Sequence, residues 1–392
     1  MDKKIVGLLA LLKSAVTGVP EQLPAEFSLE EAETLIIKQA LTMVAFHGAM
    51  ICGIPAELPV MQRLRMRYLR LLLQSERQML AVENLLQALD NAGVDHMMVK
   101  GCDLKRLYPK PELRPMGDAD ILIRTEQYDR VKAVMESLGY TFRSENQHVY
   151  EWSTSHLHVE LHKTLIPPSD RRFYESYGTG WKYARHRSGH RFELTPEDAF
   201  VFLVVHFARH YLYSGVGCRH VLDLYVYSRA YPELNWKYIE SELRRLRLWE
   251  FCGNVMRTLD VWFHNGAADH VTGQITEFVF SGGDWGSLEN LLNFASAGEA
   301  EKKGSVTNSK MHAFMNALFP STSYMSYQYS VLLRKPWLTP VIWVIRWFDI
   351  LLFRPQKVKR KIQILRTVND ATTAKHIQAF QEVGLDFAPD EQ

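Results

Sequence analysis

A block of short, strand-like segments between two long stretches of helical periodicity most constrains the fold. Val94–Val99 and Asp118–Ile123 are short and mostly apolar, as in strands. Asp103–Tyr108, between them, predicts one short helix. A second helix is expected from Thr125, as its cap, to Leu138, with Gly139 as its C-terminal stop. This strand–helix–strand–helix order predicts an α/β or α+β core of roughly 100 residues.

Three further strands are expected after the second helix, at Tyr140–Arg143, Val149–Trp152 and Leu157–Leu161. The flanks have apolar residues at helical spacing, as in Ile5, Leu8, Leu9, Leu12 and Val16. Thr195-Pro196-Glu197-Asp198 has the composition of a helix start. We therefore predict an N-terminal helical region (1–90), an α+β core with a mixed sheet (91–194) and a C-terminal helical region (195–392).

Composition excludes several classes of protein. The 392 residues are 47% hydrophobic and 23% charged, which argues against a disordered or fibrous chain. A net charge of +2 gives no global attraction to nucleic acid or acidic membranes, so an anion site must be local. The four cysteines form no CxxC or zinc pattern, which favours a reducing, cytoplasmic location.

No transmembrane segment is expected, because no run of 18 uncharged apolar residues occurs. The stretch Trp337–Phe353 is interrupted by Arg346 and Asp349, and it is interpreted as a buried or interfacial helix. Gly298–Lys310 is small and polar, and it predicts a loop.

The segment Asp118-Ala119-Asp120-Ile121-Leu122-Ile123 carries the clearest chemical signal. Alternate residues of a strand share a face, so Asp118 and Asp120 are expected to point the same way. Two close carboxylates repel each other unless a cation lies between them. Mg²⁺ binds one or two carboxylates and leaves positions for phosphate oxygens, so this pair predicts a magnesium site.

A third carboxylate is expected from the strand that follows. In the segment His158–His162, Glu160 shares one face with the two histidines that end it. Glu160 completes a two-metal acid set if this strand lies beside the Asp118–Asp120 strand. Alternating histidines do not match the helical zinc spacing, so surface or hydrogen-bonding roles are favoured over zinc binding.

Several motifs together resemble a known family. The chain resembles the uncharacterised nucleotidyltransferases of the DNA polymerase β superfamily in four successive motifs. In chain order these are KG..L…YP.P..R.MGDADILI, a helix ending in LGY, the strand motif VELH, and TPED…H…RH……R..LDL. The match extends from about Val94 to Tyr227, in order and spacing. It implies a minimal nucleotidyltransferase fold with helical flanks.

The resemblance also implies a ligand set. Asp118, Asp120 and Glu160 would hold Mg²⁺, with two ions implied, and a nucleoside triphosphate such as ATP would be the substrate. Lys100 and Gly101 stand where the superfamily has its glycine–serine turn for the triphosphate, but Cys102 replaces the serine.

Other residues are implied by the same resemblance. Arg114 would contact the triphosphate, and Arg219 would reach the nucleotide. Asp223 matches the R..LD element that Arg219 begins. His206 and His210 match the helical histidines, with packing or hydrogen-bonding roles favoured over metal binding.

The implied reaction moves an NMP group from the NTP to an acceptor and releases pyrophosphate. The acceptor class stays open between a small molecule, tRNA and protein, and no oligomeric state is predicted. One alternative is a catalytically weak nucleotide-binding regulatory module, which the missing serine motivates.

A second alternative is an RNA-binding protein, motivated by the basic runs 244–247 and 357–361. Solvated helix faces explain these runs more simply. The same interpretation applies to Arg63, Arg65, Arg67 and Arg70. The residues Trp337, Trp343, Trp347 and Phe348 are spaced as a packing face.

Overall fold

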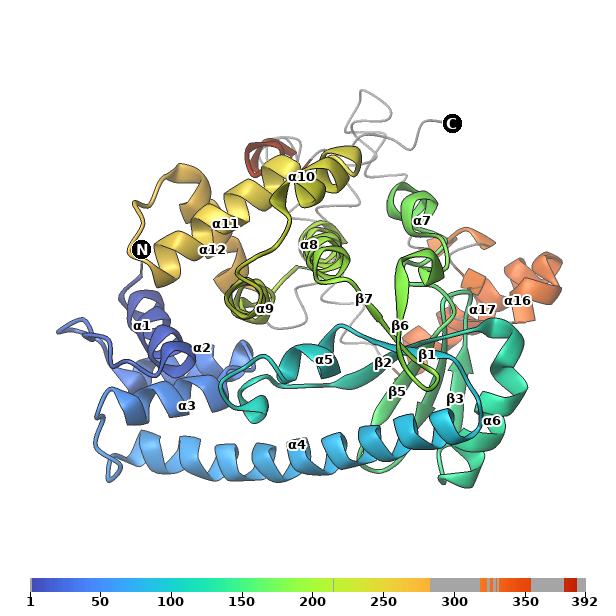
Figure 1. Ribbon diagram of the computed structural model, residues 1–392, viewed down its shortest axis with the longest axis horizontal. Helices are drawn as coiled ribbons and strands as arrows, with labels where there is room; N and C mark the ends of the chain where they lie inside the picture. The colour runs from blue at the N-terminus through green and yellow to red at the C-terminus, as the bar shows by residue number, and fades with distance from the viewer. Residues whose placement is uncertain are drawn as a thin grey trace.

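The computed structural model describes residues 2–213, 215–282, 331–353 and 377–385, with short stretches between 318 and 329. Its centre is a seven-stranded mixed sheet in the order β3-β4-β5-β2-β1-β7-β6. The strands are β1 (His96–Val99), β2 (Asp118–Ile123), β3 (Thr141–Glu145), β4 (Val149–Ser153), β5 (His158–His162), β6 (Ala184–Ser188) and β7 (Arg191–Leu194). Helical regions flank this sheet (Figure 1), so the predicted α+β class with a mixed sheet is confirmed.

The predicted strands are all present, with small shifts at their ends. β2 has the predicted bounds, whereas β5 begins and ends one residue later than expected. The hairpin of β6 and β7 was not predicted. β6 has no apolar alternation and is largely exposed, and β7 alternates over only four half-buried residues. A left-handed Gly189 forms its turn.

The two predicted core helices differ from expectation at their starts. The first is α5 (Gly101–Lys105), which begins two residues earlier and also ends three residues earlier than the predicted Asp103–Tyr108. The second starts as a 3₁₀ turn, Thr125–Gln127, and becomes α6 at Tyr128–Ser137. Thr125 is therefore inside the turn and does not cap the α-helix, which corrects the sequence prediction. Gly139 follows the helix with φ +77°, as its predicted role requires.

The N-terminal region consists of α1 (Lys3–Thr17), α2 (Leu29–Lys38), α3 (Thr42–Ile51) and α4 (Pro59–Asn91). The predicted apolar face of α1 is buried. The 33-residue α4 runs along one edge of the molecule from α1–α3 to the sheet (Figure 1). The arginines Arg63, Arg65, Arg67 and Arg70 lie on its exposed surface, as predicted.

Further helices follow the first five strands. They are α7 (Arg171–Tyr177), α8 (Pro196–Tyr213), α9 (Cys218–Ala230), α10 (Trp236–Arg245), α11 (Trp249–Phe263) and α12 (His270–Ser281). The predicted helix start at Thr195 is confirmed, since its Oγ1 accepts a hydrogen bond from the backbone N–H of Asp198 (2.9 Å). The later helices include α16 (Val331–Arg334) and α17 (Thr339–Phe353).

The two faces of the sheet are covered by different helices. On one face, Ala119 and Ile121 of β2 pack with Leu85 of α4 and Met135 of α6 in one core. On the other face, Leu122 belongs to a core that includes the N-terminal helices and α8–α12. Asp118 and Asp120 alternate with the first set, so they point toward α8 and α9. The boundaries of the three regions stay predictions.

In the part of the chain that the structure describes, no helix is long and apolar enough to cross a membrane. Of the four aromatic residues predicted as a packing face, Trp343 and Trp347 of α17 donate their indole N–H groups to backbone carbonyls. Phe348 of α17 and Trp337, in the 3₁₀ turn before it, are exposed, so the prediction is wrong for these two. The predicted loop at 298–310 and the basic run at 357–361 lie outside the described residues.

Candidate active site

The parallel pairing of β2 with β5 brings the predicted carboxylates together. The register places Asp120 directly opposite Glu160 and Asp118 opposite His158. Directly paired residues on adjacent strands present their side chains on the same face. Asp118, Asp120 and Glu160 therefore form a group on the face of the sheet toward α8 and α9, as their alternation predicts.

Asp120 is the most tightly held of the three acids. Its side chain is buried, and its Oδ1 accepts hydrogen bonds from Nζ of Lys100 (2.9 Å) and from Nε2 of His162 (2.7 Å). Burial would raise the pKa of Asp120, but the charges and hydrogen bonds of Lys100 and His162 outweigh burial and hold the pKa well below its usual range. Asp120 is therefore ionised at neutral pH.

The pKa of Asp118 is shifted in the opposite direction from that of Asp120. Burial raises its pKa to about 6, and the neighbouring Asp120 and Glu160 add to the shift. Burial also acts against ionisation of Glu160, but its hydrogen bond to His162 helps to keep that pKa below the usual value. The three carboxylates concentrate negative charge on one side of the site. A divalent cation bound there would reduce the repulsion among them.

Lys100 and Gly101 shape the turn between β1 and α5. Lys100 adopts a positive φ of 57°, which is strained for a residue with a side chain. A Cβ at Gly101 would lie 2.9 Å from Nη1 of Arg114, so only glycine allows the guanidinium to come this close. The following Cys102 is fully buried, and burial raises its pKa to about 12. Its Sγ donates to Sδ of Met116 (3.1 Å), and Cys102 does not line the cavity described below, so the thiol is no substitute for the missing serine.

Arg114 is buried beside this turn and is held by Asp223 of α9. Its Nε and Nη2 donate to the two carboxylate oxygens of Asp223, each at 2.8 Å, and the Tyr108 hydroxyl donates to Oδ1 at 2.8 Å. The predicted triphosphate contact thus has a guanidinium whose orientation is set by a bidentate pair. Nη1 is not part of that pair.

A cavity of about 300 Å³ lies between the sheet and the helices α8 and α9. All seven predicted site residues line it: Lys100, Gly101, Arg114, Asp118, Asp120, Glu160 and Arg219. Sequence reasoning missed three other residues of its wall, which are His148, Arg209 and His220, and it did not name His162 as a site residue. The cavity therefore combines a carboxylate wall with a wall of arginines and histidines.

Among the histidines of the wall, His162 has contacts to both Asp120 and Glu160. His162 is 1% exposed and lies between Asp120 and Glu160. Oε2 of Glu160 is 3.5 Å from Nε2 of His162. Burial and Lys100 lower its pKa, but the hydrogen bonds to the two acids outweigh them and leave it raised. The favoured hydrogen-bonding role is confirmed for this histidine. Its alternation with Glu160 was the available sequence signal.

The fold and site define a class: an α+β protein with a buried carboxylate group facing cations across a cavity, which suits binding of a metal–phosphate ligand. The chain belongs to the family of uncharacterised nucleotidyltransferases, since a sequence profile of that family matches residues 26–264, more than half of its length. The suspected family is thereby confirmed, while placement in the larger superfamily stays a prediction. Searches of curated proteins and of solved structures found no match.

Proposed function

We propose that this protein is a Mg²⁺-dependent nucleotidyltransferase that moves an NMP group from an NTP to an acceptor hydroxyl. The observation that carries the proposal is the convergence of three carboxylates from β2 and β5 at a cation-lined cavity. Family membership supports a transferase that uses a nucleotide.

The donor set fits magnesium. Asp118 and Asp120 lie on one face of β2, and Glu160 is the register partner of Asp120. Carboxylate oxygens are the ligands that Mg²⁺ prefers, and repulsion among these acids falls when a cation is bound. When bound there, magnesium would neutralise phosphate oxygens at the transferred group.

The cations of the cavity are suited to the polyphosphate. Nζ of Lys100 donates a charged hydrogen bond to Asp120, and Lys100 lines the cavity, so the ammonium group would be available to a phosphate oxygen bound there. Arg114 is oriented by Asp223, and Arg219 lines the same cavity from α9. These groups would stabilise the charge that develops on the departing pyrophosphate.

Glu160 is suited to receive the acceptor proton. Its hydrogen bond to His162 helps to keep the carboxylate ionised, so an oxygen is free to accept a proton, but the low pKa makes Glu160 a weak base. The acceptor hydroxyl would therefore have to be acidified by a bound metal ion. The acceptor oxygen forms a bond to the α-phosphorus, and the bond to the bridging oxygen breaks. Pyrophosphate leaves with that oxygen, and the hydroxyl proton moves to Glu160.

The acceptor is proposed to be a small molecule, a tRNA end or a protein side chain. Of the basic run 244–247, Arg244 and Arg245 are paired with Glu240 and Glu242 on α10. This pairing reduces the positive charge that RNA would meet. Nucleotide binding without turnover is the remaining alternative, and product analysis separates it from transfer.

The test uses an NTP labelled at its α-phosphate, Mg²⁺ and acceptor panels of all three kinds. Labelled product and free pyrophosphate are expected from the wild-type chain, and both are expected to fall by at least about a hundredfold in Asp120→Asn and Glu160→Gln. Asp129→Asn is the control, because Asp129 is an exposed carboxylate on α6. Equal product from all four proteins would remove the site assignment.

A further inference from the structure

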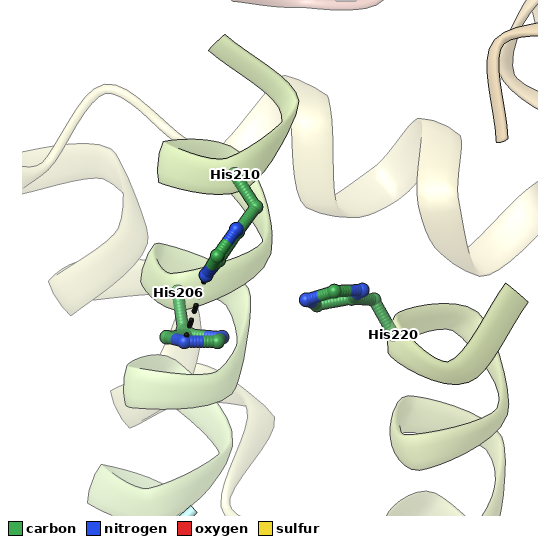
Figure 2. Close-up of side chains that lie close together, drawn as sticks. All are labelled: His206, His210 and His220. Carbon is green, nitrogen blue, oxygen red and sulfur yellow. Dashed lines mark hydrogen bonds between the residues drawn. The ribbon is translucent and has the colours of Figure 1, made fainter. Parts of the chain in front are cut away.

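Three histidines meet on the helical wall of the cavity, apart from the carboxylate group. His206 and His210 lie one turn apart on α8, and His220 faces them from α9 (Figure 2). The ring centroids are 4.4 Å apart for His206 and His210, 5.0 Å for His210 and His220, and 5.6 Å for His206 and His220. Their arrangement gathers three imidazoles around one point.

The spacing on α8 is the one that helical metal sites use. Histidines at positions i and i+4 share a helix face and bind zinc together in the metalloprotease helix motif. Here the intervening residues are Phe207, Ala208 and Arg209, so no glutamate base accompanies the pair. The helix thus supplies two ligands without the protease chemistry.

The distances are close to those a tetrahedral ion requires. Zinc–nitrogen bonds of about 2.0–2.1 Å place the nitrogens of a tetrahedral site roughly 3.3 Å apart. The Nε2 atoms of His206 and His210 are 3.2 Å apart and share a hydrogen bond, which is the role the sequence favoured for this pair. An ion bound by both would replace this bond, with the proton moving to Nδ1 of the donor ring. One ligand nitrogen from each of the three histidines lies within 4.8 Å of the others. The His220 nitrogen therefore has to move by at most about 1.5 Å to reach tetrahedral spacing, and rotation about its side-chain bonds is the movement available to it.

The protonation of the histidines also suits metal binding. Burial lowers the pKa of His206 and His210 well below the usual value and that of His220 to about 3. Neutral imidazoles present a lone pair, which is the form that binds metals. Nδ1 of His220 is buried with no hydrogen-bond partner, which is costly unless a ligand satisfies it.

We propose that His206, His210 and His220 form a binding site for a borderline transition-metal ion of the Zn²⁺ class, with its fourth coordination position open to the cavity. Imidazole is a ligand that Zn²⁺ accepts and Mg²⁺ avoids, so this site differs in chemistry from the carboxylate group. Three protein ligands and an open position are typical of a zinc site that binds an exchangeable molecule.

The fourth ligand is an anionic oxygen. All three histidines line the cavity, and the positive charges of Lys100, Arg209 and Arg219 act on His210. These cations oppose a bare metal ion but favour an ion that carries an anion. A phosphate or carboxylate group in the cavity supplies this ligand.

The test is direct metal binding by the full chain after removal of metals with a chelator. Co²⁺ is the probe, because its visible absorption is strong when tetrahedral and weak when octahedral. One equivalent of tetrahedral Co²⁺ is expected, displaced by Zn²⁺ and unaffected by excess Mg²⁺. Added phosphate or acetate should shift the band, and a band that neither anion changes would overturn the open position.

Separate variants assign the metal to its ligands. His210→Ala and His220→Ala should each lower Zn²⁺ affinity at least about tenfold. Asp120→Asn and Glu160→Gln should leave the tetrahedral band intact, since these residues belong to the carboxylate group. His264→Ala is the surface control, because this histidine is exposed and outside the trio.

A measurement on the wild-type chain keeps the proposal falsifiable if a histidine variant fails to fold. X-ray absorption at the zinc edge distinguishes imidazole ligands from carboxylate ligands. Three imidazoles and one oxygen are expected. A spectrum of carboxylate ligands, a band lost in Asp120→Asn, or no bound Zn²⁺ would each overturn the trio as a metal site. These readouts do not depend on nucleotidyl transfer.

Discussion

Arg114 and Asp223 form a buried bidentate ion pair across 109 positions of sequence, which joins the chain before β2 to helix α9. Both side chains are less than a tenth exposed. The pair fixes one wall of the cavity relative to the other. The orientation of a proposed phosphate ligand therefore depends on a contact between the core and the C-terminal helices.

Asp223→Ala is expected to destabilise the protein strongly. It leaves the buried Arg114 guanidinium without its counter-charge, which typically costs about 3–5 kcal/mol. Urea unfolding measures the loss. Asp129→Ala, at an exposed carboxylate in the first turn of α6, should cost no more than about 1 kcal/mol. Similar losses in the two variants would contradict the role of the pair.

Lys105 is expected to make stability depend on pH. Its Nζ is buried and donates to Oγ of Ser75 (2.9 Å) and to the Arg114 carbonyl (2.7 Å). Burial lowers its pKa to about 8, and the Arg114 charge adds to the shift. Between pH 8 and the unfolded value of about 10.4, the unfolded chain holds more protons, so the free energy of unfolding should rise with pH.

The comparison is urea unfolding of wild type and Lys105→Met from about pH 7 to about pH 10. The variant lacks the titrating amine, so the difference in stability between the two proteins should change over this interval. A difference that stays constant with pH would show that Lys105 does not titrate there.

Asp118→Asn is expected to stabilise the metal-free protein above about pH 6. The folded-state pKa of Asp118 is raised to about 6 by burial and then by Asp120 and Glu160, so the folded chain holds the extra proton. The raised pKa of Asp118 makes its full contribution to the free energy of unfolding below about pH 3.9, which is the pKa of Asp in the unfolded chain. This contribution is lost as the pH rises through about 6. Asparagine avoids this loss of about 1–3 kcal/mol.

Magnesium should make the wild-type chain more stable than Asp118→Asn, which reverses their order of stability without metal. It restores stability to the wild-type chain by binding the ionised carboxylates, whereas Asp118→Asn gains less. Melting temperatures at about pH 5 and about pH 7.5, with and without Mg²⁺, measure both effects. If Mg²⁺ raises both melting temperatures equally, Asp118 is no metal ligand.

Lys100→Met is expected to weaken nucleotide binding. The ammonium group that pairs with Asp120 is the cation proposed to contact a phosphate oxygen, and loss of one charged hydrogen bond costs about tenfold or more in affinity. Calorimetry with Mg²⁺ and a non-hydrolysable NTP measures the change. Lys132→Met serves as the comparison, because Lys132 is exposed on α6. Unchanged affinity in Lys100→Met would assign the contact elsewhere.

Local features of the site follow from the sequence. The exact bounds of β2 and the shared face of Asp118 and Asp120 come from strand periodicity, which is a property of neighbouring residues. Glu160 follows from the same alternation. The hairpin β6–β7 was missed because β6 has no apolar alternation and the alternation of β7 covers only four half-buried residues. Pairing of β7 with β1 therefore decides that this segment is a strand.

The sequence alone determined which residues carry charge and which of them share a strand face, because both depend on local spacing. Only the tertiary structure decided that β5 pairs with β2 in the register that sets Glu160 opposite Asp120. It also decided that Arg114 is held by Asp223 and that His220 meets the histidines of α8. These contacts join distant segments, and the packing of whole helices and strands selects them by the total area buried.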